Sequence, residues 1–282
     1  MGLNLSTSAA EGADPVADAV RAEELGFDFV SVSDHLHGTH PTFETWTLLT
    51  WIAAATTRIG VVSNVLGLPY RSPAVLAKMA ETLDRMSGGR FVLGLGAGGM
   101  DAEFAGFGLP VRTPGEKVDG LEDALRILHG MWDGPSFRYE GPVYGVGGAE
   151  MEPKPQHPIP VWIGGIGPRS LRLIGRLGDG WLPSMAMVPP DEVRSKRGVI
   201  VAAAEEAGRD PASITWAYNV TVHVDGVLKD PDRAVGGSAD AVVDRLGTLI
   251  DDLGLTALNV WPAGEAAEQV EAFAADVLPH LR

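Results

Sequence analysis

The chain has 282 residues, of which 45% are hydrophobic and 21% charged, and it contains no cysteine. This length suffices for one large domain or a closely fused pair. The missing thiols exclude a disulfide framework and any Cys-ligated zinc or iron–sulfur site. The formal net charge of −15 argues against nucleic acid and anionic membranes as partners, because both require clustered Lys and Arg. We therefore expect a small organic molecule as the partner.

The longest apolar stretch, residues 48–69, makes a poor membrane span because Arg58, Ser63 and Asn64 interrupt it. No apolar run follows a basic start, so neither a secretory signal nor a transit peptide is predicted. We expect a cytoplasmic protein.

Short β-branched runs alternate with capped amphipathic segments along nearly the whole chain. Strands are predicted at residues 2–6, 27–33, 59–65, 91–95, 161–163, 180–183, 214–223 and 257–261. Helices are predicted at residues 15–25, 43–56, 73–87, 115–131, 168–177, 191–207, 238–253 and 266–278. In the third helix, Val75, Met79, Leu83 and Met86 are predicted to form one apolar face. Residues 133–158 are rich in Gly and Pro and predict a long surface excursion with a hairpin.

These eight strand–helix units are the number that a single (β/α)8 TIM-like barrel requires, which would span residues 1–282 with the excursion 133–158 between its fourth and fifth units. The rival architecture is a doubly wound sheet, which usually carries a nucleotide fingerprint after its first strand. Here that strand leads into Thr7-Ser8-Ala9-Ala10 instead. The barrel is therefore the favoured α/β fold.

In a barrel, reactive groups sit at the C-terminal ends of the strands. The second strand runs into Ser33-Asp34-His35, where an imidazole can handle a proton near neutral pH and the carboxylate can orient it. The alternative is a histidine packed against the rim. His37 and His40 suggest a metal, but no carboxylate or Cys cluster accompanies them, so no metal site is predicted.

The third strand ends in Ser63-Asn64, which indicates either a hydrogen-bonding site at the rim or ordinary loop capping. Residues 94–99, at the end of the fourth strand and just after it, satisfy the pattern G-x-G-x-x-G. A dinucleotide role is not favoured, because residues 100–108 do not predict a helix that opens on the last glycine. We expect these glycines to let a flat ring system approach the backbone.

The fifth strand leads through a Gly-rich turn, residues 164–167, into a helix that begins at Pro168. Free N–H groups and the helix dipole favour an anion at such a position. Arg169 and Ser170 could add charge-assisted bonds to a phosphate. The alternative is a tight turn in which the glycines merely satisfy geometry.

Three sets of residues carry a family resemblance: Ser33-Asp34-His35, then 71–73 with 82–90 and 94–98, and finally 160–167 with 175–181. In these stretches the sequence resembles the bacterial luciferase-like monooxygenase superfamily, especially its branch that uses the deazaflavin coenzyme F420. The resemblance implies a barrel with a flavin or deazaflavin across its C-terminal mouth. It also implies a non-proline cis peptide between Asn64 and Val65, in a bulge of the third strand that supports the ring.

The resemblance further implies that His35 lies beside the reactive centre and assists proton movement. It places phosphate contacts on the strand-four glycines and the strand-five turn. The residues predicted to bind the cofactor are Asp34, His35, Asn64, Val65, Ala97, Gly98, Gly164, Gly165, Ile166, Gly167 and Arg169.

The sequence thus predicts an F420-dependent oxidoreductase that moves a hydride between the deazaflavin and a small organic substrate. One alternative is an FMN-dependent monooxygenase that uses reduced flavin and oxygen, and another is a non-enzymatic flavin- or deazaflavin-binding protein. Gly99 stands where the branch's sugar-phosphate dehydrogenases carry Glu, and Lys196 is the one candidate for a basic phosphate pocket, so sugar-phosphate oxidation is not expected. We also expect a homodimer, formed through the apolar surface of Trp46, Leu48 and Trp51.

Overall fold

Eight parallel strands close into a barrel in the computed structural model, which describes residues 1–281. The eighth strand pairs with the first, so the sheet has no open edge and the predicted TIM-like (β/α)8 fold is confirmed. The barrel strands are β1 (Gly2–Leu5), β2 (Phe29–Val32), β3 (Gly60–Ser63), β5 (Phe91–Gly96), β8 (Val161–Ile163), β9 (Gly180–Trp181), β10 (Thr215–Val224) and β12 (Ala257–Pro262).

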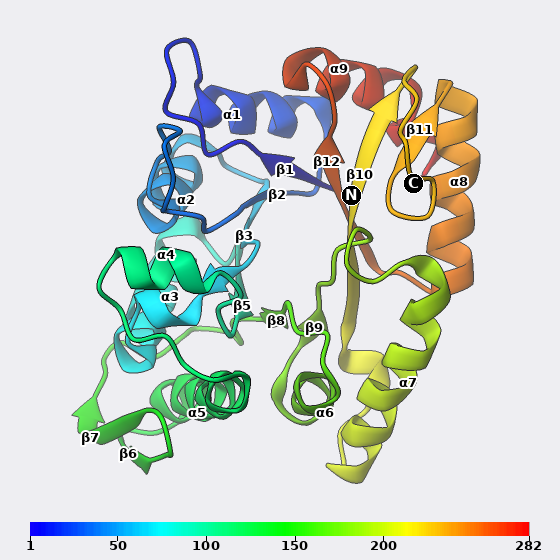
Figure 1. The fold of residues 1–282 in the computed structure, drawn as a ribbon. Coiled ribbons are helices and arrows are strands. Elements are labelled where there is room, and N and C mark those ends of the chain that lie inside the picture. Colours follow the sequence, from blue (N-terminus) through cyan, green and yellow to red (C-terminus); the bar gives the residue numbers. More distant parts are fainter. Residues whose placement is uncertain (282) are drawn as a thin grey trace.

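Figure 1 shows the helices in a ring around these strands. They bury apolar side chains against the outside of the barrel, as the alternating pattern predicts. The ring helices are α1 (Pro15–Leu25), α2 (Thr45–Ala55), α3 (Pro73–Ser87), α5 (Pro114–Asp133), α6 (Pro168–Leu177), α7 (Pro190–Glu206), α8 (Ala239–Leu253) and α9 (Ala266–Asp276). The described residues contain no helix that is both long and apolar enough to span a bilayer.

The helix ends follow local chemistry that is visible in the sequence. The Asp14 side chain accepts a hydrogen bond from the Ala17 N–H and so caps α1. Gly26 and Gly254 end α1 and α8 with φ of 89° and 58°, a left-handed conformation that glycine adopts without a steric penalty. These boundaries therefore agree with the prediction to within a residue.

Several short elements were not predicted. They are β4 (Leu66–Gly67), α4 (Asp101–Gly106), β11 (Val235–Gly237) and the 3-10 turns Leu68–Tyr70, Pro211–Ser213 and Leu278–His280. Residues 100–108 were predicted not to form a helix that opens on Gly99, and α4 indeed begins two residues later, but no helix was predicted there at all. A helix of six residues is too short to show a hydrophobic period. The excursion does hold a hairpin, made of β6 (Ser136–Glu140) and β7 (Gly145–Glu150).

The predicted apolar face of α3 is only partly right. Leu83 is buried as expected, but Val75 and Met86 are 57% and 77% exposed, and the other buried apolar residues are Leu76, Ala77 and Ala80. Small alanine side chains let α3 approach its neighbours closely, and the Trp132 indole of α5 donates a hydrogen bond to the Ala77 carbonyl. The small side chains Ala77 and Ala80 therefore face the neighbouring elements, and the larger Val75 and Met86 face solvent.

The barrel interior is layered. Val62, Trp162, Leu182 and Ala217 form an apolar layer, against which Phe29 packs with its ring 5.9 Å from that of Trp162. Since side chains on a strand alternate between faces, the inward residues two positions further along form the next layer. That layer is polar and lies nearer the C-terminal ends of the strands.

Candidate active site

His35 follows β2 at the barrel mouth and is held by a carboxylate from α4. Its Nδ1 lies 2.9 Å from Glu103 Oε1, and the Tyr70 hydroxyl donates to Glu103 Oε2 across 2.9 Å. The Glu103 side chain is 9% exposed, whereas that of His35 is 60% exposed. Burial and then the Glu103 carboxylate raise the pKa of Tyr70, so its hydroxyl remains a donor to Glu103 at neutral pH.

This arrangement fixes which nitrogen of His35 is available. A carboxylate accepts hydrogen bonds, so Nδ1 must carry the proton that points at Glu103. Nε2 has no partner among the described residues. It therefore has a free lone pair in the neutral ring, and in the charged ring it has a proton to donate. His35 is placed to exchange a proton with a molecule in the mouth.

Asp34 has a different role from His35. Its side chain is fully buried, and it accepts hydrogen bonds from the Gly67 N–H at 2.8 Å and from both terminal nitrogens of Arg71. Arg71 also binds Glu44, the N-cap of α2. Although burial opposes its charge, the hydrogen bonds to Asp34 and Glu44 raise the pKa of Arg71. Asp34 therefore ties the loop after β2 to β4, and both of its oxygens are engaged by protein groups.

The peptide bond between Asn64 and Val65 is cis, as the family resemblance implies. It lies between β3 and β4, where the chain bulges toward β5 and β8. A Cβ at Gly94 would lie 1.7 Å from the Ser63 carbonyl oxygen, and one at Gly96 would lie 2.8 Å from a Val65 methyl. The expectation that these glycines make room for a ring is thus revised, because they make room for the bulge itself.

The polar layer described above surrounds Asn64. The Asn219 Oδ1 atom accepts hydrogen bonds from Asn64 at 2.9 Å, from Asn259 at 2.7 Å and from the Trp261 indole at 3.3 Å. Asn259 in turn donates to Ser31 Oγ at 2.8 Å. All these side chains except Trp261 are buried, so the network holds the Asn64 amide in one orientation.

The turn after β8 presents the N-terminus of α6. No side chain caps this helix, whose N-cap is Gly167, and no described residue accepts a hydrogen bond from the N–H groups of Gly165, Ile166 or Gly167. A Cβ at Gly167 would meet nothing within 4 Å. These free N–H groups at a helix N-terminus are the feature on which the prediction of an anion site rests.

Two other predicted phosphate contacts are positioned differently. Arg169 is half-exposed and pairs with Asp119 on α5, so its guanidinium already has a carboxylate partner. Gly98, next to Ala97, has φ of 90°, and a Cβ there would lie 2.8 Å from the Phe104 ring. The positive φ at position 98 and the nearby Phe104 ring of α4 therefore both require glycine there.

The structure brings together most of the predicted site. Val65 packs against Gly96 and Gly164, and Asp34 reaches Gly67 behind the same bulge. Glu103 and Tyr70 were not predicted as site residues, and no helix was predicted at α4. The polar layer was not predicted either, although alternation along each predicted strand could have located it. The residues of that layer that were not predicted are Asn4, Ser31, Asn219, Asn259 and Trp261.

No group of three or more metal-ligating side chains occurs within residues 1–281. The His37 ring packs edge-on against Phe107, with centroids 6.2 Å apart. This histidine therefore forms part of the wall of the mouth.

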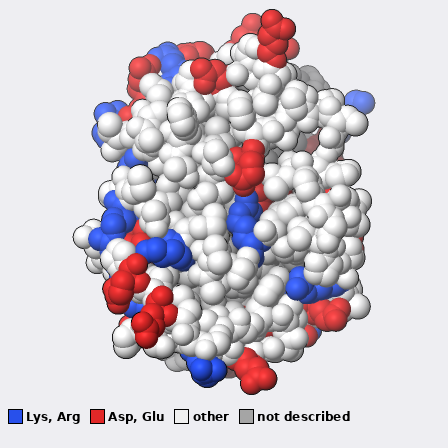
Figure 2. Space-filling view, turned by 90° about the vertical axis from the view of Figure 1, so that its left-hand side faces the viewer, with Lys and Arg blue, Asp and Glu red and all other residues white. Residues whose placement is uncertain are grey.

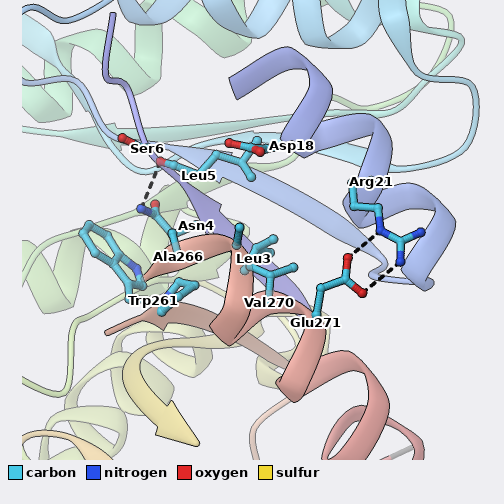
Figure 3. Close-up of a pocket in the computed structure, with 12 residues that line it drawn as sticks. Leu3, Asn4, Leu5, Ser6, Asp18, Arg21, Trp261, Ala266, Val270 and Glu271 are labelled. Atoms are coloured by element: carbon cyan, nitrogen blue, oxygen red, sulfur yellow. Dashed lines mark hydrogen bonds and ion pairs between the residues drawn. The ribbon is translucent and has the colours of Figure 1, made fainter. Parts of the chain in front are cut away.

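The fold and the residues at its mouth define a (β/α)8-barrel enzyme with its site at the C-terminal ends of the strands. Figure 3 shows the residues that line a cleft between α1 and α9, including Asn4 and Trp261 of the polar layer. The volume of this cleft is about 220 Å³. The ion pair between Arg21 and Glu271 lies at its other end.

Comparison with known proteins identifies the family. The model of the luciferase-like monooxygenase family matches residues 3–253, so the chain belongs to this family and is an oxidoreductase. It is 34% identical over 232 residues to an F420-dependent glucose-6-phosphate dehydrogenase of Nakamurella multipartita, which covers 79% of this chain and 67% of the relative. It is 31% identical over 237 residues to a 5,10-methylenetetrahydromethanopterin reductase of Archaeoglobus fulgidus, covering 80% and 67%.

Solved structures agree on the fold. An F420-dependent secondary alcohol dehydrogenase in complex with an F420-acetone adduct superposes with a TM-score of 0.88 at 19% identity, over 100% of this chain and 98% of the other. The coenzyme F420 dependent tetrahydromethanopterin reductase from Methanopyrus kandleri gives 0.82 at 21% identity, over 100% and 99%.

Proposed function

We propose that this protein is an F420-dependent oxidoreductase that transfers a hydride between the deazaflavin and a small organic substrate. The observation that carries the proposal is His35, which has Nδ1 fixed by Glu103 and Nε2 free at the mouth of the barrel. Relatives named as F420-dependent dehydrogenases and as a methanopterin reductase support the choice of cofactor.

The residues present fit such a cofactor. The bulge at Asn64 and Val65, backed by glycines and held by Asn219, would support the flat ring, and the uncapped N-terminus of α6 at Gly167 would hold a phosphate. Ala97 and Gly98 directly follow β5, and in the sequence they lie between the bulge at Asn64 and the turn at Gly167. When bound, the deazaflavin would give or accept the hydride.

The chain's own residues would manage the accompanying proton. His35 Nε2 would donate a proton to the substrate oxygen or remove one from it. Glu103 would keep the ring in the required tautomer and stabilise its charged form, and Tyr70 would orient Glu103. The apolar layer beneath, around Trp162, would keep water out of the barrel interior.

Gly99 lies in open space, with no atom within 4 Å of an added Cβ. The position at which the resemblance implies a glutamate in sugar-phosphate dehydrogenases therefore carries no acid here. We propose that a sugar phosphate is not the substrate, although relatives carry that name.

We also propose that the protein acts in the cytoplasm as a homodimer.

The alternative function is an FMN-dependent monooxygenase. This alternative is considered because the family is described as luciferase-like monooxygenases.

Parallel reconstitution distinguishes the two functions. The apo-protein is loaded with reduced F420 or reduced FMN, and oxygen uptake and cofactor oxidation are recorded with a panel of carbonyl acceptors. The proposal expects acceptor-dependent oxidation of F420 without oxygen uptake. Acceptor-dependent oxygen uptake with FMN, and no turnover with F420, would contradict it.

A further inference from the structure

The mouth of the barrel is edged by exposed apolar side chains. The described residues expose nine large hydrophobic side chains, and six of them lie in connections that follow barrel strands. A monomer normally exposes such residues singly, and a group of them at one end marks a binding surface. These six, the apolar rim, are Phe43, Met100, Phe107, Val111, Met187 and Val227.

One arc of the apolar rim is joined to the candidate catalytic histidine. The Phe107 ring is 54% exposed and lies 6.1 Å from the Tyr70 ring, edge-on. Tyr70 binds Glu103, which in turn binds His35. An aromatic surface therefore stands beside the proton-handling nitrogen, and Met100, 53% exposed, precedes the helix that carries Glu103.

The second arc lies in the connections after β9 and β10. Met187 and Val227 are 62% and 94% exposed. Arg233 of the β10–β11 connection donates a hydrogen bond to the Ala186 carbonyl, so these two connections touch. Apolar side chains therefore occur on both arcs.

Cations that could bind a substrate phosphate are mostly occupied. Among the described residues, five cations pair with carboxylates: Arg71 with Asp34, Lys117 with Asp101, Arg169 with Asp119, Lys196 with Glu192 and Arg233 with Asp230. Arg112 lies over the Tyr144 ring, 4.8 Å from its centroid. Arg172 of α6 and Lys229 form no ion pair within residues 1–281. A doubly charged phosphate at the five paired cations would have to break existing ion pairs, and the net charge of −15 disfavours it further.

We propose that the substrate is an uncharged molecule with an apolar body and one alcohol or carbonyl oxygen, and that it lies against Phe107 and Met100 with this oxygen at His35 Nε2. The inference rests on the proposed function. With the deazaflavin as hydride acceptor, oxidation of an alcohol would leave a carbonyl, and His35 Nε2 would take up the O–H proton. In the reducing direction His35 Nε2 would return that proton to the carbonyl oxygen.

Binding measurements test this inference directly. Cyclohexanone and glucose 6-phosphate are titrated into the protein with and without F420, and binding is followed by saturation-transfer NMR. We expect cyclohexanone to bind and glucose 6-phosphate to show no saturable binding. Phe107→Ala and Met100→Ala should each weaken cyclohexanone binding by about tenfold, because each removes apolar contact area.

Met86→Ala is the matched control for Met100→Ala. Met86 is 77% exposed in the last turn of α3, at the end of the helix far from the mouth, so its loss should leave binding unchanged. Equal weakening by the control variant, or tighter binding of glucose 6-phosphate than of cyclohexanone, overturns the inference.

The arm without F420 separates this inference from the proposed function. If F420 does not bind but cyclohexanone binds and depends on Phe107, the cofactor assignment fails while the substrate class stands.

Discussion

His35 and Glu103 show how a single side chain acquires a defined chemical role. The histidine is exposed and by itself could be an ordinary rim residue. A buried carboxylate in the connection after β5 fixes its tautomer and leaves Nε2 as the ring nitrogen without a partner among the described residues. Tyr70 then satisfies the second carboxylate oxygen, so Glu103 has a partner for each oxygen.

Replacing His35 tests that role. His35→Ala should lower turnover by roughly 10²–10⁴-fold while the affinity for F420 changes by less than about threefold, since the lost group handles a proton. Steady-state kinetics at saturating F420, with a parallel cofactor titration, measures both quantities. Undiminished turnover at saturating cofactor would rule the role out.

Glu103→Gln is the companion variant. The amide keeps the side-chain volume, but its nitrogen end can no longer accept the hydrogen bond that fixes His35 Nδ1. We expect turnover at saturating F420 to fall about tenfold or more while the affinity for F420 changes little, with the fold intact by circular dichroism. Turnover equal to that of the unaltered protein would show that Glu103 does not position His35.

Glu23 connects two elements, the end of α1 and the start of β3. Its carboxylate accepts hydrogen bonds from the N–H groups of Thr57, Arg58 and Ile59. Although desolvation opposes the charged form, these hydrogen bonds lower the pKa of Glu23 to about 2. A depressed folded-state pKa gives stability that is present above the unfolded pKa, near 4.3, and is lost as the pH falls toward 2.

Glu23→Gln should therefore lower the free energy of unfolding at pH 7 by about 1 kcal/mol, because the site is solvent-exposed and screened. The difference from the unaltered protein should shrink as the pH falls from 4.5 to 2. Urea unfolding at a series of pH values measures it. A constant difference across this range would contradict the assignment.

The turn before α6 offers a test at the scale of one element. Gly167→Val places a side chain in open space over the helix N-terminus, at φ −78° and ψ 156°, which valine readily adopts. F420 should bind on the order of tenfold more weakly, and its phosphate-free deazaflavin headgroup should bind as before. Equal weakening of both ligands would place the phosphate elsewhere.

Gly165→Val is the less informative change. A Cβ at Gly165 would lie 2.6 Å from Ser170 Cβ, so this variant disturbs the packing of the turn itself. It should weaken phosphorylated cofactors further, but it also reduces stability. Arg169→Ala should have a smaller effect than Gly167→Val, because Arg169 is paired with Asp119.

The elements differ in how well the sequence predicted them. Strands and ring helices followed from hydrophobic alternation and from caps such as Asp14 and Gly254. The helix α4 was missed because six residues carry no period, and Glu103 was missed with it. The inner face of α3 was only partly right because packing density, not hydrophobicity, decided between Ala80 and Met86.

At the scale of the whole molecule, the predicted homodimer has a candidate surface. Figure 2 shows the side that includes α2 and α3, with broad uncharged areas between small charged clusters. Trp51 of α2 and Val75 of α3 are 68% and 57% exposed. Of the residues predicted for this surface, Leu48 is buried and Trp46 packs against the Phe91 ring, so Trp51 is the one that remains available.

Light scattering at micromolar concentration tests the dimer. We expect a mass near twice the 29.7 kDa of the chain, and Trp51→Lys should shift it toward the monomer by placing a charge in the interface. Met86→Lys, a charge on the far end of α3, is the control. A monomeric mass for the unaltered protein would exclude the dimer.

A parallel equilibrium titration of the apo-protein with F420 and FMN decides which of the two cofactors the protein binds. Fluorescence of each ligand reports binding in the same buffer, over concentrations from nanomolar to about 1 mM. We expect F420 to bind saturably and at least about tenfold more tightly than FMN. Gly167→Val should weaken the binding of F420. Tighter binding of FMN, or no saturation with F420, would contradict it.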